Sequence, residues 1–177
     1  SYGGFVSAVY ALRHHNALRK MIIVCGAIDL NDMSSDLLVD EMRHSLSDES
    51  QRIMNIPVKS NIDFKRFVEH SLPLYFYDKK YVSEFNLKNK SSYRYSAYCK
   101  GELERRKLAH YRKLYSSIDT STLIIDGKYD FIEGPMSSEL FRKSAHNCSY
   151  CLFEKSGHFP FVEEQALFLR TVTNFLT

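Results

Sequence analysis

Residues 122–135 read TLIIDGKYDFIEGP, and residues 153–164 read FEKSGHFPFVEE. An apolar run begins the first stretch, and another, at 150–154, leads into the second. Nearly continuous apolar runs of this length are typical of parallel strands that are covered on both faces. Each run passes into a loop with one side chain suited to proton chemistry, Asp130 after the first and His158 after the second. We therefore predict two parallel strands, over 122–126 and 150–154, whose following loops lie at the same edge of a sheet.

A third apolar run, MIIVCGA at residues 21–27, predicts another buried strand. Helical spacing of apolar residues predicts a helix over 4–13, and Pro135 suits the first turn of another. A last helix is expected from about Glu163 to the C-terminus, with Glu163 and Glu164 favouring its positive end. This alternation of helices and strands predicts an α/β fold.

The composition is that of an ordinary globular protein. The 177 residues are 44% hydrophobic and 25% charged, which argues against disorder. The net charge of +3 is small and spread along the chain, so we expect no nucleic-acid partner and no membrane-surface partner. No apolar run approaches the roughly 20 residues that cross a bilayer. The first residues lack the features of a signal peptide, and we expect a cytoplasmic protein.

Four cysteines are too few for a disulfide scaffold and indicate a reduced, intracellular chain. Cys25 lies in an apolar run and is interpreted as buried filling. Cys148 and Cys151, with His146 nearby, superficially suggest zinc, but a structural site needs four ligands and no second pair stands at a suitable spacing. We predict no metal and no cofactor, and packing roles for these cysteines.

Residues 31–116 show several amphipathic helical stretches and no convincing pair of strands. This pattern predicts a helical insertion over the carboxyl edge of the sheet. Possible helix N-caps are Ser34, Ser35 and Asp36 in one place and Asn61 or Asp63 in another, the second helix being stopped by Pro73. A helix over 101–115 carries a basic face, interpreted as a solvated surface rather than a nucleic-acid contact through 104–113. The expected division is a core of residues 1–30 and 117–177 with a helical cap over 31–116.

The chain begins SYGGF, which passes directly into the first predicted helix. In a strand–turn–helix elbow the nucleophile projects upward, and small neighbours are needed because sheet and helix crowd together. Gly3 and Gly4 would supply that smallness, and the amide of Tyr2 would be one oxyanion donor. A flexible glycine-rich segment is the alternative for this stretch taken alone.

The order Ser1, Asp130, His158 is the order of a nucleophile, its orienting acid and its base in one large class of hydrolases. Asp126 is nearer to the strand than Asp130, but it ends the strand, whereas Asp130 falls in the loop. A carboxylate in this role fixes the tautomer of the imidazole and stabilises the imidazolium. An acidic turn residue and a structural loop histidine are the alternatives.

Together these motifs resemble the α/β-hydrolases, particularly the proline iminopeptidase-like branch. SYGG is similar to the second part of that branch's G-x-S-Y-G-G elbow, and residues 122–164 are similar to its acid and histidine loops. The resemblance implies Ser1 as nucleophile, His158 as base and then acid, and Asp130 as the residue that orients it. The family's sheet has about eight strands, and its other oxyanion donor lies upstream of the nucleophile. We therefore expect the N-terminal part of the same fold to be missing here, from a protein of about 270 to 290 residues.

The function expected is that of a serine hydrolase cleaving an ester or an amide or peptide bond of a small molecule or short peptide. Aromatic residues gather in 75–98, where one or two could line an apolar acyl or prolyl pocket. In iminopeptidases cap carboxylates hold the substrate's amine, and Glu41, Glu69 and Glu84 are candidates by position. The alternatives are a non-catalytic small-molecule binder of the same fold and a Ser1 nucleophile that uses its own amine as base.

Overall fold

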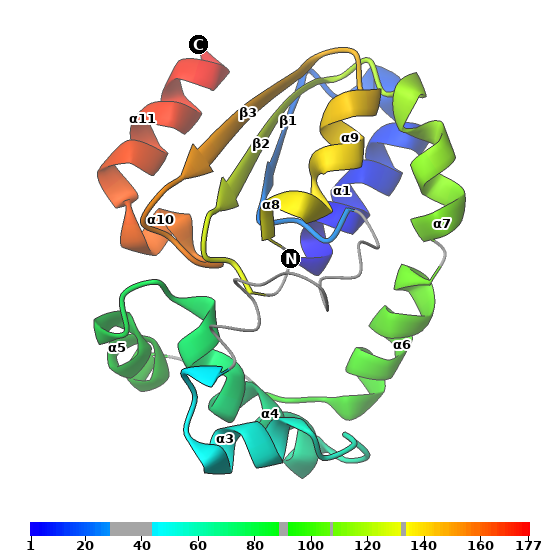
Figure 1. Cartoon of the computed structure of the whole chain (residues 1–177). Coiled ribbons are helices and arrows are strands. Elements are labelled where there is room, and N and C mark those ends of the chain that lie inside the picture. The colour runs from blue at the N-terminus through cyan, green and yellow to red at the C-terminus, as the bar shows by residue number, and fades with distance from the viewer. Residues whose placement is uncertain (29–43, 89–91, 107, 132–133) are drawn as a thin grey trace.

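A computed structural model describes residues 1–28, 44–88, 92–106, 108–131 and 134–177 (Figure 1). Within them lies a parallel sheet of three strands in the order β1, β2, β3. The strands are β1 (Lys20–Val24), β2 (Ser121–Gly127) and β3 (Cys148–Phe153). The prediction of three parallel strands is confirmed. The first strand is shorter than predicted because Cys25, at its end, has a φ of 45°, which is outside the range of extended backbone.

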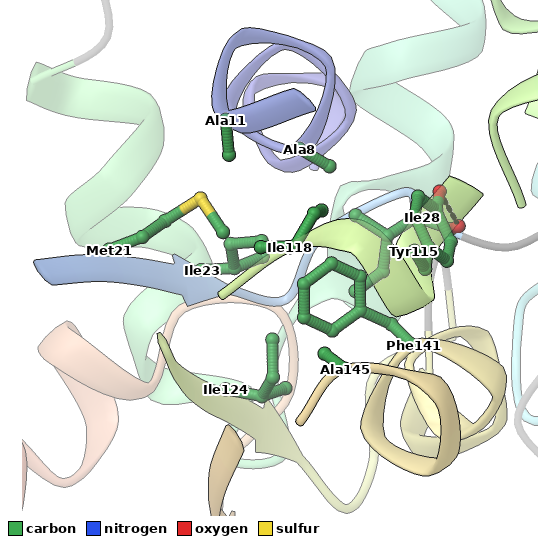
Figure 2. Close-up of a cluster of buried hydrophobic side chains, with 10 residues drawn as sticks. All are labelled: Ala8, Ala11, Met21, Ile23, Ile28, Tyr115, Ile118, Ile124, Phe141 and Ala145. Carbon is green, nitrogen blue, oxygen red and sulfur yellow. Dashed lines mark hydrogen bonds between the residues drawn. The ribbon is translucent and has the colours of Figure 1, made fainter. Parts of the chain in front are cut away.

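Alternate residues of the strands face two separate apolar layers. On one face, Ile23 and Ile124 pack with Ala8 of α1 (Tyr2–Arg13) and Phe141 of α9 (Glu139–Ser144), as Figure 2 shows. On the other face, Leu123 and Ile125 pack against α11 (Gln165–Leu176). Burial of each large side chain contributes about 1.5 to 3 kcal/mol. Coverage of both faces explains why the central strand β2 is apolar and buried along most of its length, whereas β3 is exposed or half-buried except at Phe153.

Helix α1 lies unusually close to the end of β1. A Cβ on Gly4 would stand 2.6 Å from the Cα of Gly26, so no larger residue fits there. The small residue expected after the elbow is therefore required at Gly4. Gly3 differs from that expectation, because a Cβ added to it meets no described atom within 4 Å.

The C-terminal segment forms the short helix α10 (Pro160–Glu163) and then α11, which confirms the last helix predicted from about Glu163 to the C-terminus. The two glutamates turn back to the loop before them. Glu163 Oε2 accepts the N–H of Gly157 at 2.6 Å, and Glu164 Oε2 accepts the Ser156 hydroxyl at 2.7 Å. These two carboxylates, which lie where α10 ends and α11 begins, hold the histidine loop in place.

Between β1 and β2 the described chain is helical. Figure 1 shows α3 to α6 beyond the carboxyl ends of the strands, where an insertion was predicted. The elements are η1 (His15–Ala17), α3 (Asp48–Met54), α4 (Asn61–Ser71), η3 (Leu72–Tyr75), α5 (Lys80–Lys88), α6 (Tyr95–Arg105), α7 (Leu108–Tyr111) and η4 (Arg112–Ser117), with α8 (Gly134–Ser137) following β2. The division into core and cap stays a prediction.

Two details of this segment differ from the prediction, and one prediction concerns residues that the structure does not describe. The hydroxyl of Ser60, not Asn61 or Asp63, caps α4 by accepting the N–H of Asp63 at 3.1 Å. The helix predicted over 101–115 is divided into the end of α6, α7 and η4. The caps predicted at 34–36 lie outside the described residues. None of the helices within the described ranges is both long enough and apolar enough to span a lipid bilayer.

Candidate active site

His158 and Asp130 form a buried hydrogen-bonded pair at the carboxyl edge of the sheet. Nδ1 of His158 lies 2.9 Å from Oδ2 of Asp130, and the two residues are only 5% and 3% exposed. Asp130 follows β2 and His158 follows β3, so neighbouring parallel strands deliver both side chains to one edge. The carboxylate can fix an imidazole tautomer with its proton on Nδ1, which leaves Nε2 free to accept another proton.

The backbone around His158 is held by the helical segment. The N–H of His158 donates to the carbonyl of Tyr75 at 2.8 Å, and the ring of Tyr75 lies edge-on to the imidazole. Phe159 stacks on Tyr75 with its ring centroid 5.7 Å away. These contacts leave the imidazole little freedom to rotate away from Asp130.

Two glycines allow the loops after β2 and β3 to touch. A Cβ on Gly127 would stand 1.9 Å from the carbonyl oxygen of Gly157. A Cβ on Gly157 would stand 2.4 Å from the carbonyl oxygen of Tyr75. Backbone thus meets backbone on both sides of the histidine loop, and no side chain fits between them.

Ser1 lies at the amino end of α1 and is anchored to the end of β1. Its nitrogen donates to the carbonyl of Cys25, and its own carbonyl accepts the N–H of Ala27 at 3.0 Å. No hydrogen bond joins its hydroxyl to His158 in the described part of the chain, so the structure does not by itself complete the predicted set of three. Tyr2 is the first residue of α1, so its N–H has no acceptor within the helix. This N–H is therefore suited to bind a negative charge.

Cys25 contacts both Ser1 and the Asp130–His158 pair, and this position was not predicted from the sequence. Its side chain is buried as expected, but possible ligand atoms on Cys25, Asp130 and His158 all lie within 4.8 Å of one another. Burial raises the pKa of the Cys25 thiol well above its usual range, and the charges of Asp130 and Asp126 raise it further. The sequence did offer one signal, because Cys25 directly follows β1, at the same edge of the sheet as Asp130 and His158.

The family model for the alpha/beta hydrolase fold matches residues 1–165. The chain belongs to this family. Its fold is therefore that of the alpha/beta hydrolases, as predicted, with a parallel sheet and flanking helices. No curated protein sequence gives a significant match.

Solved hydrolases share the fold at low sequence identity. A meta-cleavage product hydrolase from Pseudomonas fluorescens IP01 superposes with a TM-score of 0.68 and 18% identity, covering 99% of this chain and 62% of that one. The monoacylglycerol lipase of Paleococcus ferrophilus superposes with a TM-score of 0.68 and 17% identity, and the match covers 99% of this chain and 65% of the lipase. An esterase from Exiguobacterium antarcticum superposes with a TM-score of 0.59 and 19% identity, and the match covers 99% of this chain and 63% of the esterase. The chain thus spans less than two thirds of the length of these hydrolases.

Cys148, Cys151 and His146, the residues considered for zinc, do not form a close group of ligand atoms in the described part of the chain. Cys148 and Cys151 lie on β3 as free thiols. His146 instead faces Asp119, with 3.6 Å between Nδ1 and Oδ1, and both side chains are largely exposed. Among the described residues, the group of three metal-ligating side chains is Cys25, Asp130 and His158.

Asp126, the other carboxylate considered for the acid, is hydrogen-bonded to Ser138 in this fold. Its Oδ2 accepts the hydroxyl of Ser138, and its Oδ1 is buried without a described hydrogen-bond partner. Burial raises the pKa of Asp126 to about 7, which the Ser138 hydrogen bond only partly offsets. The folded protein therefore holds Asp126 protonated at pH values where the unfolded chain releases the proton.

This difference predicts that Asp126→Asn changes how stability depends on pH. Between pH 4 and 7 the folded state binds more protons at this site than the unfolded state, so wild-type stability falls as pH rises. Relative to wild type, Asp126→Asn should gain about 2 to 3 kcal/mol of unfolding free energy from pH 5 to pH 8. Urea unfolding of the full-length proteins at both pH values measures this. The exposed Asp119→Asn is the control, and a gain no larger than that of the control contradicts the prediction.

Proposed function

We propose that this protein is a serine hydrolase that cleaves carboxylic esters through an acyl-enzyme. The observation that carries the proposal is the buried Asp130–His158 hydrogen bond at the carboxyl edge of the sheet. Ser1 stands at the same edge, anchored to Cys25, whose thiol lies against that pair. The family match adds the expectation of hydrolytic chemistry at this edge.

In the proposed mechanism Nε2 of His158 takes the hydroxyl proton of Ser1 as the oxygen attacks the ester carbonyl. Asp130 stabilises the imidazolium that results. The oxyanion is bound by the N–H of Tyr2 at the positive end of α1, together with a second donor from outside this chain. His158 then gives its proton to the departing alcohol, and a water molecule activated by the same nitrogen releases the acid.

A cavity of about 250 Å³ with a mixed apolar and polar lining is proposed to bind the acyl group. It lies beside Phe131, which directly follows Asp130, and its lining residues are Leu46, Gln51, Met54, Asn55, Phe67 and Phe131. Leu46 and Phe131 also pack with Leu74, and the next residue, Tyr75, contacts the imidazole of His158. The cavity is thus connected through Leu74 and Tyr75 to the loop that carries His158.

The lining of this cavity favours an ester over the free N-terminus of a peptide. An aminopeptidase needs a carboxylate near the scissile bond to hold the substrate's amine, and the cavity's described lining contains none. Glu69 pairs with Lys65 at 3.7 Å on an exposed helix face, Glu84 is exposed, and Glu41 lies outside the described residues. The iminopeptidase-like specificity suggested by the motifs therefore stays a prediction that ranks below ester cleavage.

The proposal includes a partner, the remaining strands of the same fold. The solved hydrolases are longer than this chain, and β1 is an edge strand of the sheet described here. The nitrogen of Ser1 lies 3.4 Å from the carbonyl oxygen of Val24 in β1. Strands beside β1 would cover its free edge and supply the second oxyanion donor.

The test is turnover of p-nitrophenyl acetate, butyrate and octanoate by the full-length protein. Wild type should cleave the esters faster than proline p-nitroanilide, and Ser1→Ala should lower kcat about 10³-fold or more. Ser7→Ala, which removes a hydroxyl bonded to the Gly3 carbonyl on the same helix, is the matched control. Equal rates for Ser1→Ala and wild type would overturn the proposal. Binding of the esters without turnover would favour the small-molecule binder.

A further inference from the structure

Cys25 is held rigidly against the Asp130–His158 pair. It follows β1 with a φ of 45°, and its N–H donates to the carbonyl of Ile125 in β2 at 2.8 Å. Its Sγ lies 3.8 Å from the carbonyl oxygen of Gly157, the residue before His158. The thiol is 1% exposed and has no role in the proposed ester hydrolysis.

The three side chains offer the donor atoms that zinc-like cations prefer. A thiol sulfur, an imidazole nitrogen and a carboxylate oxygen all lie within 4.8 Å of one another. Ligand atoms around a tetrahedral Zn²⁺ stand about 3.3 to 3.8 Å apart, given bonds of about 2.0 to 2.3 Å. Shifts of about 1 Å therefore suffice for all three donors to reach one ion. All three residues are at least nine-tenths buried, and three protein ligands leave the fourth tetrahedral position to a water molecule.

We propose that Cys25, Asp130 and His158 form a binding site for a thiophilic divalent cation of the Zn²⁺ and Cd²⁺ class, and that its occupation inhibits the enzyme. Binding rests on the geometry of the three side chains, whereas inhibition also rests on the proposed function. The thiol proton passes to solvent as the sulfur binds the ion, and no oxidant or reductant is needed.

Inhibition follows from the chemistry of the imidazole. If Nε2 binds the ion, its lone pair no longer accepts a proton from Ser1. If Nδ1 binds the ion, the hydrogen bond to Asp130 is lost and the remaining ring proton lies on Nε2, which then acts only as a donor. In both cases His158 cannot act as a base, and removing the ion restores it.

The binding half is tested on the full-length protein with ZnCl₂ in calorimetry and with CdCl₂ in ultraviolet difference spectra. Cys25→Ser should weaken Zn²⁺ binding by more than the roughly 10- to 100-fold that loss of an outer-shell partner costs. It should also remove the Cd²⁺–thiolate absorption of one site. Cys148→Ser, which removes a free thiol on β3, is the matched control and should keep both signals. Because Cys25→Ser could misfold, His158→Ala provides a second variant with the same expected loss of affinity.

The inhibition half uses ester hydrolysis, with each variant normalised to its own metal-free rate. Zn²⁺ should inhibit wild type and Cys148→Ser reversibly, with recovery in EDTA, and should inhibit Cys25→Ser only at much higher concentrations. Equal Zn²⁺ affinity in wild type and both site variants would overturn the site. Binding without loss of activity would overturn inhibition alone. If the protein has no esterase activity, the proposed function fails while the calorimetric and Cd²⁺ results still decide the site.

Discussion

Replacement of His158 by alanine is expected to lower kcat for p-nitrophenyl esters by about 10⁴-fold or more in the full-length protein. The imidazole is the group proposed to take the Ser1 proton, and its Nδ1 lies 2.9 Å from Oδ2 of Asp130. Asp130→Asn should cost about 10⁴-fold because the amide favours the wrong tautomer of the ring. Since the two residues act as a unit, the double variant should be no slower than the slower single variant. Steady-state kinetics of the three variants measures this.

The control for this series is His146→Ala. His146 is an exposed histidine before β3, and its contact with Asp119 lies in solvent. Its loss should leave kcat within about twofold of wild type, as expected for a surface substitution. Full activity in His158→Ala would refute the role of this residue as base. Multiplicative effects of His158→Ala and Asp130→Asn would refute their action as one unit.

Gly127→Ala is expected to reduce both stability and activity. The added Cβ would stand 1.9 Å from the carbonyl oxygen of Gly157 and 2.7 Å from that of Ser156, so the histidine loop has to move. Overpacking of backbone against backbone costs about 1 to 3 kcal/mol or more. A displacement of about 1 Å at the imidazole lowers kcat about 10²-fold. Denaturant unfolding and ester kinetics of the full-length variant measure the two effects.

Gly3→Ala is the matched control for Gly127→Ala. A Cβ at Gly3 meets no described atom within 4 Å, and the residue lies in α1. Alanine there should be neutral or stabilise the helix by up to about 1 kcal/mol. Wild-type stability and activity in Gly127→Ala would show that the two loops do not press on each other as described.

Local sequence was sufficient for the strands and for the acid and base candidates. Apolar runs located β1, β2 and β3 to within a few residues, and the central strand β2, covered on both faces, is the most continuously buried of them. Asp130 and His158 follow neighbouring parallel strands, and that order alone placed them at one edge of the sheet. Other details depend on contacts between side chains and backbone that the spacing of apolar residues does not show. Glu163 and Glu164, expected only to favour the positive end of the last helix, also accept hydrogen bonds from the histidine loop.

The sequence by itself determined the fold family, the parallel strands and the residues able to form an acid–base pair, since these depend on periodicity and on order along the chain. Tertiary structure adds that Asp130, the acid chosen from the sequence, is hydrogen-bonded to His158, whereas Asp126 within β2 accepts the hydroxyl of Ser138. It also decided that Cys25, more than a hundred residues from His158 in the chain, lies against the pair. The physical reason is that contacts across a parallel sheet join residues whose separation in sequence carries no signal of their proximity.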